Sequence, residues 1–301
     1  MTKLLTAVCR DDQCDGDVAA PPVPWWSVTK TCLAACALVL VARRRLTLDD
    51  LLPDRAYTLR HLLAHTSGLG SYTARPEYHA AIERHETPWT DSDLFGRLRF
   101  DPFLFAPGEG WSYSNTGYFL VRHLIEQTVN APIDAALQEL VFAPLGIERS
   151  KIAVEPSDLD RCAWGNGNRY HPGWVFHGLV IGPPVDAARF MHRLMRGGLL
   201  APALHAAMRE RRALDVPLDK RPWRGAGYGL GLMMPSGSAS GPALGHTGQG
   251  PDSTAAVFHF PEAVPPRTAA AFAPTEDVAV VEGAVVDLAG GRMDIEPGCR
   301  M

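Results

Sequence analysis

The sequence predicts an α/β fold in which an antiparallel sheet, flanked by helices and built from both termini, is combined with an inserted all-helical lobe. The first observation is that strand-like runs stand near the two ends of the chain. The second is that the middle of the chain reads as a succession of helices. A sheet must bury its apolar face against another layer, so the two ends together predict a sheet covered by helices. The strand-like runs are residues 4–10, 227–234, 254–260 and 267–273.

The length of 301 residues favours about two lobes. We expect residues 1–50 and 220–301 to form an α/β sandwich lobe, and residues 51–219 to form a helical lobe.

The N-terminal elements are a strand, a turn and a buried helix. An Asp- and Gly-rich turn follows the strand at residues 4–10, and a proline-rich stretch leads to Ser27. An apolar helix then runs to about Arg45, where three consecutive arginines suit the negative end of the helix dipole. The next segment, LTLDDLLPD, is expected to be a turn and a loop.

The later elements are bounded by glycines and prolines. A helix is expected from about Thr58 to Gly68, and Gly197 and Gly198 should stop another. The C-terminal strands are separated by Gly and Pro turns. Further helices are expected at residues 91–98, 117–129, 133–140, 185–196 and 276–289.

Composition and charge exclude several classes of partner. The net charge is −4 and the only basic run is the triplet at 43–45, so we expect no nucleic-acid partner. The longest apolar run, 32–42, is too short to cross a bilayer, and no signal peptide is visible at the N-terminus. We therefore expect a cytoplasmic protein without a membrane partner, in which the six cysteines are reduced thiols. The oligomeric state is not predicted.

Ser27 and Lys30 form the first candidate catalytic pair. Lysine is rare in this chain, with four among 29 basic residues, and arginine would serve equally well as a surface cation. Arginine, however, does not give up its proton. Residues i and i+3 share a helix face, so the Lys30 amine can reach the Ser27 hydroxyl. The helix dipole and burial both disfavour an ammonium there, which favours a neutral amine that can accept a proton.

Two further short motifs carry polar side chains. In PGEGWSYSNTGY (107–118), Tyr113 and Asn115 stand two positions apart, and in GHTGQG (245–250) His246, Thr247 and Gly248 lie between expected strands. Each motif alone is equally typical of a turn or a hairpin edge.

Together, the three motifs resemble those of the serine β-lactamase-like hydrolases, the group of class C β-lactamases, D-alanyl-D-alanine peptidases, D-amino-acid amidases and related esterases. The matching motifs are S-x-x-K at 27–30, Y-x-N at 113–115 and H-T-G at 246–248. Longer stretches at 59–69, 107–118, 143–147 and 186–198 support the resemblance, which covers roughly residues 20–260.

The resemblance implies a β-lactamase/transpeptidase-like fold, an active site in the groove between the two lobes, and a role for each motif. Ser27 would attack a carbonyl carbon, with Lys30 or Tyr113 as the base, and Tyr113 would pass a proton to the leaving group. The backbone N–H groups of Ser27 and Gln249 would form the oxyanion hole. Asn115 would contact the acyl amide or order Lys30, and His246 would bind or polarise the substrate. The implied substrate-binding residues are Asn115, His246, Thr247, Gly248 and Gln249.

The chain also departs from the family pattern. Only 26 residues precede Ser27, so the sheet is expected to lose an edge strand. Trp26 stands where a small residue is usual, which would narrow one side of the pocket. The aromatic segment GNRYHPGWVFHG (167–178) is a candidate lining of the groove.

His61 and His65 have the i, i+4 spacing of helical metal ligands, but the glutamate of an H-E-x-x-H site is missing and the stretch matches the family's ordinary sequence. We therefore expect no metal and no other cofactor. A function of another class, that of a catalytically inactive scaffold, is disfavoured because all three motifs are intact.

The expected substrate is a small ester, amide or β-lactam, and a short-chain ester is favoured over a β-lactam or a D-peptide. Most β-lactam targets lie outside the cytoplasm. His246 is only partly charged at neutral pH and would hold a substrate carboxylate less firmly than a lysine. An ester also needs less assistance to its leaving group than an amide.

Overall fold

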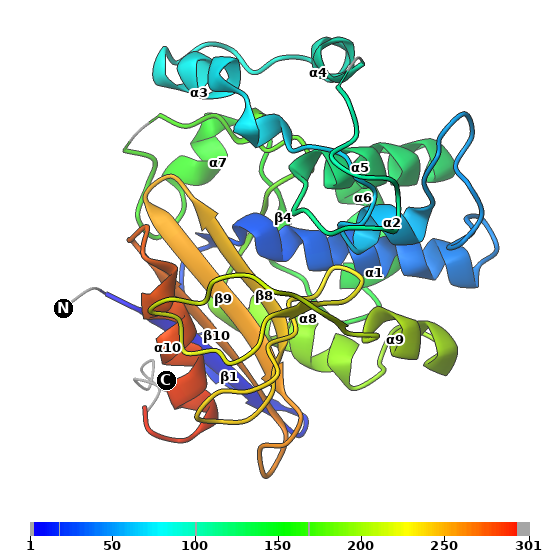
Figure 1. The fold of residues 1–301 in the computed structure, drawn as a ribbon. Coiled ribbons are helices and arrows are strands. Elements are labelled where there is room, and N and C mark those ends of the chain that lie inside the picture. Colours follow the sequence, from blue (N-terminus) through cyan, green and yellow to red (C-terminus); the bar gives the residue numbers. More distant parts are fainter. Residues whose placement is uncertain (1–2, 18, 100, 168, 294–301) are drawn as a thin grey trace.

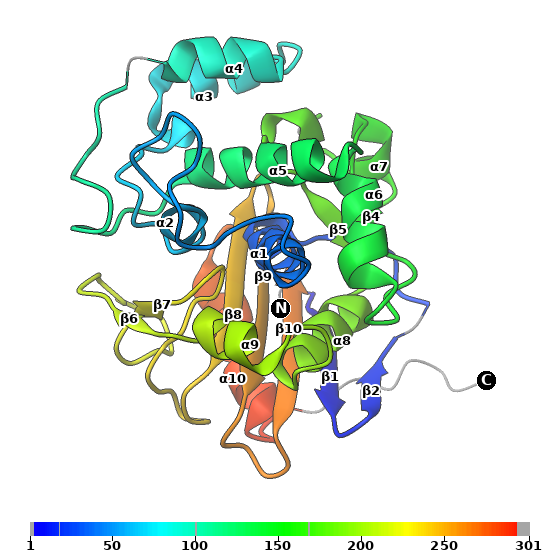
Figure 2. The same cartoon turned by 90° about the vertical axis from the view of Figure 1, so that its right-hand side faces the viewer.

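The computed structural model of the chain describes residues 3–17, 19–99, 101–167 and 169–293. Its main feature is a five-stranded antiparallel sheet with the order β2-β1-β10-β9-β8 (Figure 1, with β2 labelled in Figure 2). The N-terminal strand β1 pairs along its whole length with the C-terminal strand β10. The predicted sheet built from both termini is therefore confirmed. Its strands are β1 (Leu5–Arg10), β2 (Gln13–Gly16), β8 (Leu244–Gly250), β9 (Ser253–Phe260) and β10 (Arg267–Ala273).

Helices cover both faces of this sheet. On β10, Ala269, Ala271 and Ala273 face α10 (Val278–Ala289), while Ala270 and Phe272 face the core that contains α1 (Thr29–Ala42) and α8 (Pro184–Met195). This alternation follows from the two-residue period of a strand, and the small alanine side chains let the helices approach closely. Helix α8 lies in the segment assigned to the helical lobe, yet it contacts β1 and β10. The lobe boundaries drawn from the sequence stay a prediction.

A helical layer lies beside α1 on the side away from α10 (Figure 2). It consists of α2 (Leu59–Leu63), α3 (Pro76–Glu83), α4 (Asp91–Leu98), α5 (Asn115–Val129), α6 (Ile133–Leu137), the π-helical turn η3 (Gln138–Phe142) and α7 (Pro156–Asp160). The smaller elements are η1 (Trp26–Val28), η2 (Tyr72–Ala74), η4 (Pro172–Trp174), α9 (Pro202–Met208), the small sheet of β3 (Val23–Pro24), β5 (Val180–Gly182) and β4 (Lys151–Ile152), and the pair β6 (Arg212–Ala213) and β7 (Gly227–Tyr228).

The N-terminal hairpin corrects one prediction. The stretch after β1 is a strand, β2, and its pairing with β1 sets Cys9 opposite Cys14 with their Cα atoms 4.0 Å apart. The two residues form a disulfide, so the expectation of six reduced cysteines is wrong for this pair. Three others, Cys32, Cys36 and Cys162, are buried free thiols, and Cys299 lies outside the described residues.

Several element boundaries also differ from the predictions. Helix α2 ends well before Gly68, because His65 adopts a left-handed conformation (φ 60°). Only the first two residues of the expected strand at 227–234 form β7, because Gly231 (φ 73°) turns the chain; Met233 then forms single bridges to Tyr228 and to Gly245 of β8. The GHTGQG motif lies within β8 rather than between strands. Helices α3 and α9 were not predicted; a proline opens each of them, at Pro76 and Pro202.

Among the described residues, none of the helices combines the length and the apolar character that a bilayer crossing demands.

Candidate active site

Ser27 lies in the turn η1, immediately before α1. The residue before it, Trp26, has a positive φ of 46°, which is rare for a bulky side chain and needs support from its surroundings. That support comes from the Trp26 indole N–H, which donates to Ser253 Oγ at 2.9 Å, and from Gly250, where a Cβ atom would lie 2.4 Å from the indole ring. The strands β8 and β9 thus hold the backbone that presents Ser27.

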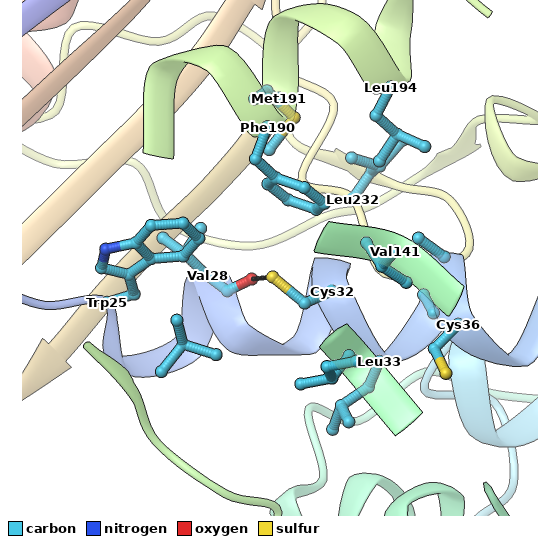
Figure 3. Close-up of a cluster of buried hydrophobic side chains, with 14 of the residues drawn as sticks. Trp25, Val28, Cys32, Leu33, Cys36, Val141, Phe190, Met191, Leu194 and Leu232 are labelled. Atoms are coloured by element: carbon cyan, nitrogen blue, oxygen red, sulfur yellow. Dashed lines mark hydrogen bonds between the residues drawn. The ribbon is translucent and has the colours of Figure 1, made fainter. Parts of the chain in front are cut away.

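Helix α1 follows the turn directly and restricts its movement, because the helix is buried on almost every side. Figure 3 shows Trp25, Val28, Cys32 and Leu33 packed among side chains of α8 and neighbouring segments. A helix fixed on every face gives Ser27 and Lys30 little freedom to move apart.

Lys30 is completely buried and its amine contacts Ser27. Lys30 Nζ lies 3.1 Å from Ser27 Oγ and 3.2 Å from Nε2 of His177. Burial holds the pKa of Lys30 well below its usual value, and the described residues place no carboxylate against the amine to oppose this effect. The predicted contact between Ser27 and Lys30 is therefore present, and its buried surroundings favour the neutral form of the amine.

Tyr113 also lies near the amine. Lys30 Nζ is 5.1 Å from the centroid of the Tyr113 ring, and the phenol lies close to the Ser27 side chain. Burial raises the pKa of Tyr113 well above its usual value, and the neighbouring Ser27 side chain offsets only part of that rise. Its ring packs on His65, with centroids 4.3 Å apart.

Strand β8 brings backbone donors next to Ser27. A Cβ atom on Gly248 would lie 2.9 Å from the Ser27 backbone nitrogen, so only glycine allows the strand to approach this closely. The N–H of Gly245 donates to Met233, away from β9, and backbone N–H groups alternate in direction along an antiparallel strand. The N–H of Gln249, four residues further, therefore points to the same edge as that of Gly245, while its side chain donates to the carbonyl oxygen of Glu276.

His246 and Thr247 lie behind the site rather than on its surface. The Tyr228 hydroxyl donates to His246 Nε2 at 3.0 Å, and His246 Nδ1–H donates to the carbonyl oxygen of Thr247 at 2.6 Å. Burial is the main cause that lowers the pKa of His246 to about 3, so the imidazole is neutral. The Thr247 hydroxyl donates to the buried carboxylate of Glu282.

A small cavity opens in front of Ser27, with a volume of about 150 Å³. Of the five expected substrate-binding residues, Asn115 and Gln249 line this cavity, whereas His246, Thr247 and Gly248 are not among the residues that line it. Asn115 Nδ2 donates to Ser71 Oγ at 3.3 Å and to Thr73 Oγ1 at 3.1 Å. The lining comprises Trp26, Ser27, Tyr72, Thr73, Tyr78, Asn115, Tyr170, Val175, His177, Gln249, Gly250 and Pro251.

His177 was missed as an individual site residue. It is separated from Lys30 by 147 residues in the sequence, and the only signal was its place in the aromatic segment 167–178. Tyr170 and His177 of that segment do line the cavity.

The two histidines considered as metal ligands have other partners. His61 Nδ1 accepts the backbone N–H of Thr58 at 3.3 Å, and His65 Nδ1 accepts that of Ser114 at 3.1 Å. Among the described residues, side chains that could jointly hold a metal ion are those of Asp91, His123 and Glu126, whose ligand atoms lie within 4.8 Å of one another. The Arg122 guanidinium already contacts both of these carboxylates, which disfavours a second cation there.

The fold and the site together define a class of protein. The β-lactamase/transpeptidase-like fold combines an antiparallel sheet built from both termini with a helical layer, and it places a buried serine–lysine pair at the start of its central helix. This chain shows the same arrangement. The family model described as Beta-lactamase matches residues 21–285. The chain therefore belongs to the Beta-lactamase family of serine hydrolases.

Comparison with known proteins finds relatives of different activities. Esterase EstB of Burkholderia gladioli is 36% identical over 151 residues, which are 43% of this chain and 38% of EstB. A D-aminopeptidase of Brucella anthropi is 29% identical over 154 residues, 48% of this chain and 29% of that protein. The chain thus spans well under half the length of these curated relatives.

Solved structures resemble the whole chain. The D-stereospecific amidohydrolase from Streptomyces sp. has a TM-score of 0.79 at 21% identity, covering 97% of this chain and 94% of that one. The D-amino acid amidase from Ochrobactrum anthropi SV3 has a TM-score of 0.77 at 22% identity, covering 96% and 94%. At these identities the similarity establishes the fold.

Proposed function

We propose that the protein is a serine hydrolase that cleaves small carboxylic esters through an acyl-enzyme formed on Ser27. The observation that carries this proposal is the contact of 3.1 Å between Ser27 Oγ and the fully buried Lys30 amine, which has no carboxylate partner among the described residues. A neutral amine at this distance can take the serine proton as the Ser27 oxygen attacks a carbonyl carbon.

The pKa values of the two candidate bases favour Lys30 over Tyr113 as the first proton acceptor. Burial lowers the pKa of the amine and so keeps it free to accept a proton. Burial raises the pKa of Tyr113, so its phenol keeps a proton and is suited to donate it to the leaving alkoxide. Transfer of the proton from the Lys30 ammonium to the Tyr113 phenolate would then return both side chains to their starting protonation states.

The negative charge that develops on the carbonyl oxygen of the substrate needs hydrogen-bond donors close to that oxygen. The backbone N–H groups of Ser27 and Gln249 are the candidates, because Gly248 lets β8 lie against η1 and the Gln249 N–H points to the free edge of the strand. Each such donor contributes about 3 kcal/mol to transition-state stabilisation. Water would then release the acid by the same steps in reverse, with Tyr113 and Lys30 serving as base.

The size of the cavity favours a small acyl group. A volume of about 150 Å³ lies below the range usual for ligand pockets, and Trp26 and Tyr170 separate it from a larger cavity of about 420 Å³. His246, neutral and buried, offers no cation for the carboxylate of a β-lactam or a peptide. These features, together with the similarity to an esterase, support a short-chain ester as the substrate.

A second candidate activity is hydrolysis of D-amino-acid amides, or of D-peptides. It is supported by the fold similarity to a D-amino acid amidase over nearly the whole chain, and by the D-aminopeptidase relative. β-Lactam turnover and the inactive scaffold are the remaining alternatives, and no described feature of the cavity favours either of them.

The cytoplasmic location stays a prediction from the sequence. The Cys9–Cys14 disulfide counts against it, because disulfides persist in oxidising surroundings and are rare in the cytoplasm.

The test compares kcat/KM for p-nitrophenyl acetate, p-nitrophenyl butyrate, D-phenylalanine amide and nitrocefin. We expect the esters to have the highest values. A higher value for the amide or for nitrocefin would refute the ester proposal in favour of that substrate. Labelling with a fluorophosphonate, followed by peptide mass analysis, should modify Ser27 in the wild type and nothing in Ser27→Ala. Label on Ser67 or Ser114, or no label, would refute the assignment of the nucleophile.

A further inference from the structure

His177 is fixed in direct contact with the Lys30 amine. It lies between η4 and β5, and only 3% of it is exposed. The loop around it is tightly held: Phe176 N–H donates to Tyr72 Oη at 3.2 Å, and Gly178, with φ 90°, donates to the carbonyl oxygen of Val175 at 2.7 Å. The imidazole is therefore a built part of the site.

The hydrogen-bonding capacity of a neutral amine defines what His177 can do. A neutral Lys30 has two N–H donors and one lone pair. If the lone pair receives the Ser27 proton, an N–H is left for His177, whose Nε2 must then be the acceptor and whose Nδ1 carries the proton. The contact of 3.2 Å between Lys30 Nζ and His177 Nε2 fits this arrangement, in which the buried Nδ1–H is left without a hydrogen-bond partner among the described residues.

Apart from Ser27 and His177, no described side chain is hydrogen-bonded to the Lys30 amine. Asn115, the residue expected to contact substrate or order Lys30, donates both of its recorded side-chain bonds to Ser71 and Thr73. The other polar groups near the amine are the rings of Tyr113 and Tyr118 and the buried imidazoles of His65 and His246. Burial keeps both of these imidazoles neutral by lowering their pKa values.

We propose that His177 is a positioning residue for the base: its Nε2 accepts an N–H of Lys30, turns the amine lone pair towards Ser27, and stabilises the ammonium that forms during acylation. This inference rests on the proposed function. As the bond from Ser27 Oγ to the carbonyl carbon forms, the serine proton moves to Lys30 Nζ. The hydrogen bond to His177 then becomes charge-assisted, which strengthens it.

The test uses the rate of Ser27 phosphonylation by a fluorophosphonate, because that reaction does not depend on the natural substrate. His177→Leu removes the acceptor, and His177→Asn places its amide too far back to reach Lys30. His177→Gln keeps an acceptor near the position of Nε2 but cannot titrate. We expect a loss of about tenfold to a hundredfold for Leu and Asn, the range for a hydrogen bond to a charged group, and at least partial rescue by Gln.

The pH profile distinguishes positioning from packing. Without the acceptor the ammonium is less stable, so the acidic limb of the labelling rate should move to lower pH in His177→Leu and His177→Asn, while KM for the ester stays near the wild-type value. His205→Leu, a histidine of α9 outside the cavity lining, is the control and should label like the wild type. Circular dichroism reports whether each variant is folded; if the Leu variant is not, the comparison of Asn with Gln decides.

The outcomes separate the two proposals. Wild-type rates in His177→Asn, or equal losses in Asn and Gln with an unmoved acidic limb, would overturn the role of His177. A wild type that labels at Ser27 but prefers an amide would overturn only the substrate. Absence of labelling in the wild type would overturn the proposed function, and the inference with it.

Discussion

Replacing Lys30 by methionine should abolish activity and yet stabilise the folded protein. Methionine has nearly the same length and is apolar, so it suits a completely buried position. The wild type must instead bury an amine whose pKa is held well below its usual value by desolvation. Keeping an amine of ordinary pKa neutral at pH 7 costs about 5 kcal/mol, which sets the upper limit of the expected gain.

The sign of the pH dependence follows from proton linkage. The unfolded wild type binds a proton on Lys30 below about pH 10, and the folded protein with its neutral amine does not. The stability of the wild type therefore rises with pH relative to Lys30→Met, by up to about 1.4 kcal/mol per pH unit. Between pH 7 and pH 9 the difference between the two proteins should shrink by about 3 kcal/mol.

The assay is urea unfolding of both proteins at pH 7, 8 and 9, followed by tryptophan fluorescence. Lys220→Met, at an exposed lysine, is the control and should show no such trend. A Lys30→Met protein that is less stable than the wild type at pH 7, or a difference that does not change with pH, would show that Lys30 is charged in the folded state. The reasoning on the base would then fail.

Four other outcomes are expected. Lys30→Arg, which cannot supply a neutral base, should lower kcat at least about a hundredfold, and near-normal turnover would reduce Lys30 to an electrostatic role. Exhaustive chelation should leave activity unchanged, whereas a loss restored by zinc would reopen the His61 and His65 site. Burial lowers the pKa of His259 to about 4, so His259 should contribute stability that is complete above about pH 6.5 and is lost as the pH falls to 4, about 3 kcal/mol in all. Unfolding of the wild type and of His259→Gln should therefore depend differently on pH in this range, and an equal pH dependence of the two proteins would contradict the prediction. Trp26→Ala should join the two cavities and raise the rate on octanoate relative to acetate esters, and an unchanged chain-length profile would show that Trp26 does not limit acyl size.

The parts of the site that could be predicted are those set by local geometry. Ser27 and Lys30 are three residues apart where the turn η1 runs directly into α1, so their contact follows from helical spacing. The pairing of the two terminal strands followed from the strand-like runs at both ends and the helices between them.

The parts that could not be predicted depend on contacts distant in the sequence. His177 reaches Lys30 from a loop with no motif, and His246 is turned inward by Tyr228, 18 residues away. The glycines of 245–250 suggested a turn by their conformational freedom, but they serve to bring β8 against Trp26 and Ser27. Cys9 and Cys14 meet only because the segment after β1 turns back as a strand.

The pairing of β1 with β10 also bears on how the protein is made. Strand β1 is synthesised long before its partner in the sheet at 267–273, so it cannot pair with that partner until those residues have been made. Closing a loop of this size is entropically costly and slows folding. The turn η1, which carries Ser27, rests on β8 and β9, and these strands come almost as late. A nascent chain stalled before residue 244 would thus carry Ser27 and Lys30 but not the backbone donors that we propose for β8. Ribosome-bound intermediates should therefore be inert towards a fluorophosphonate until the last strands emerge.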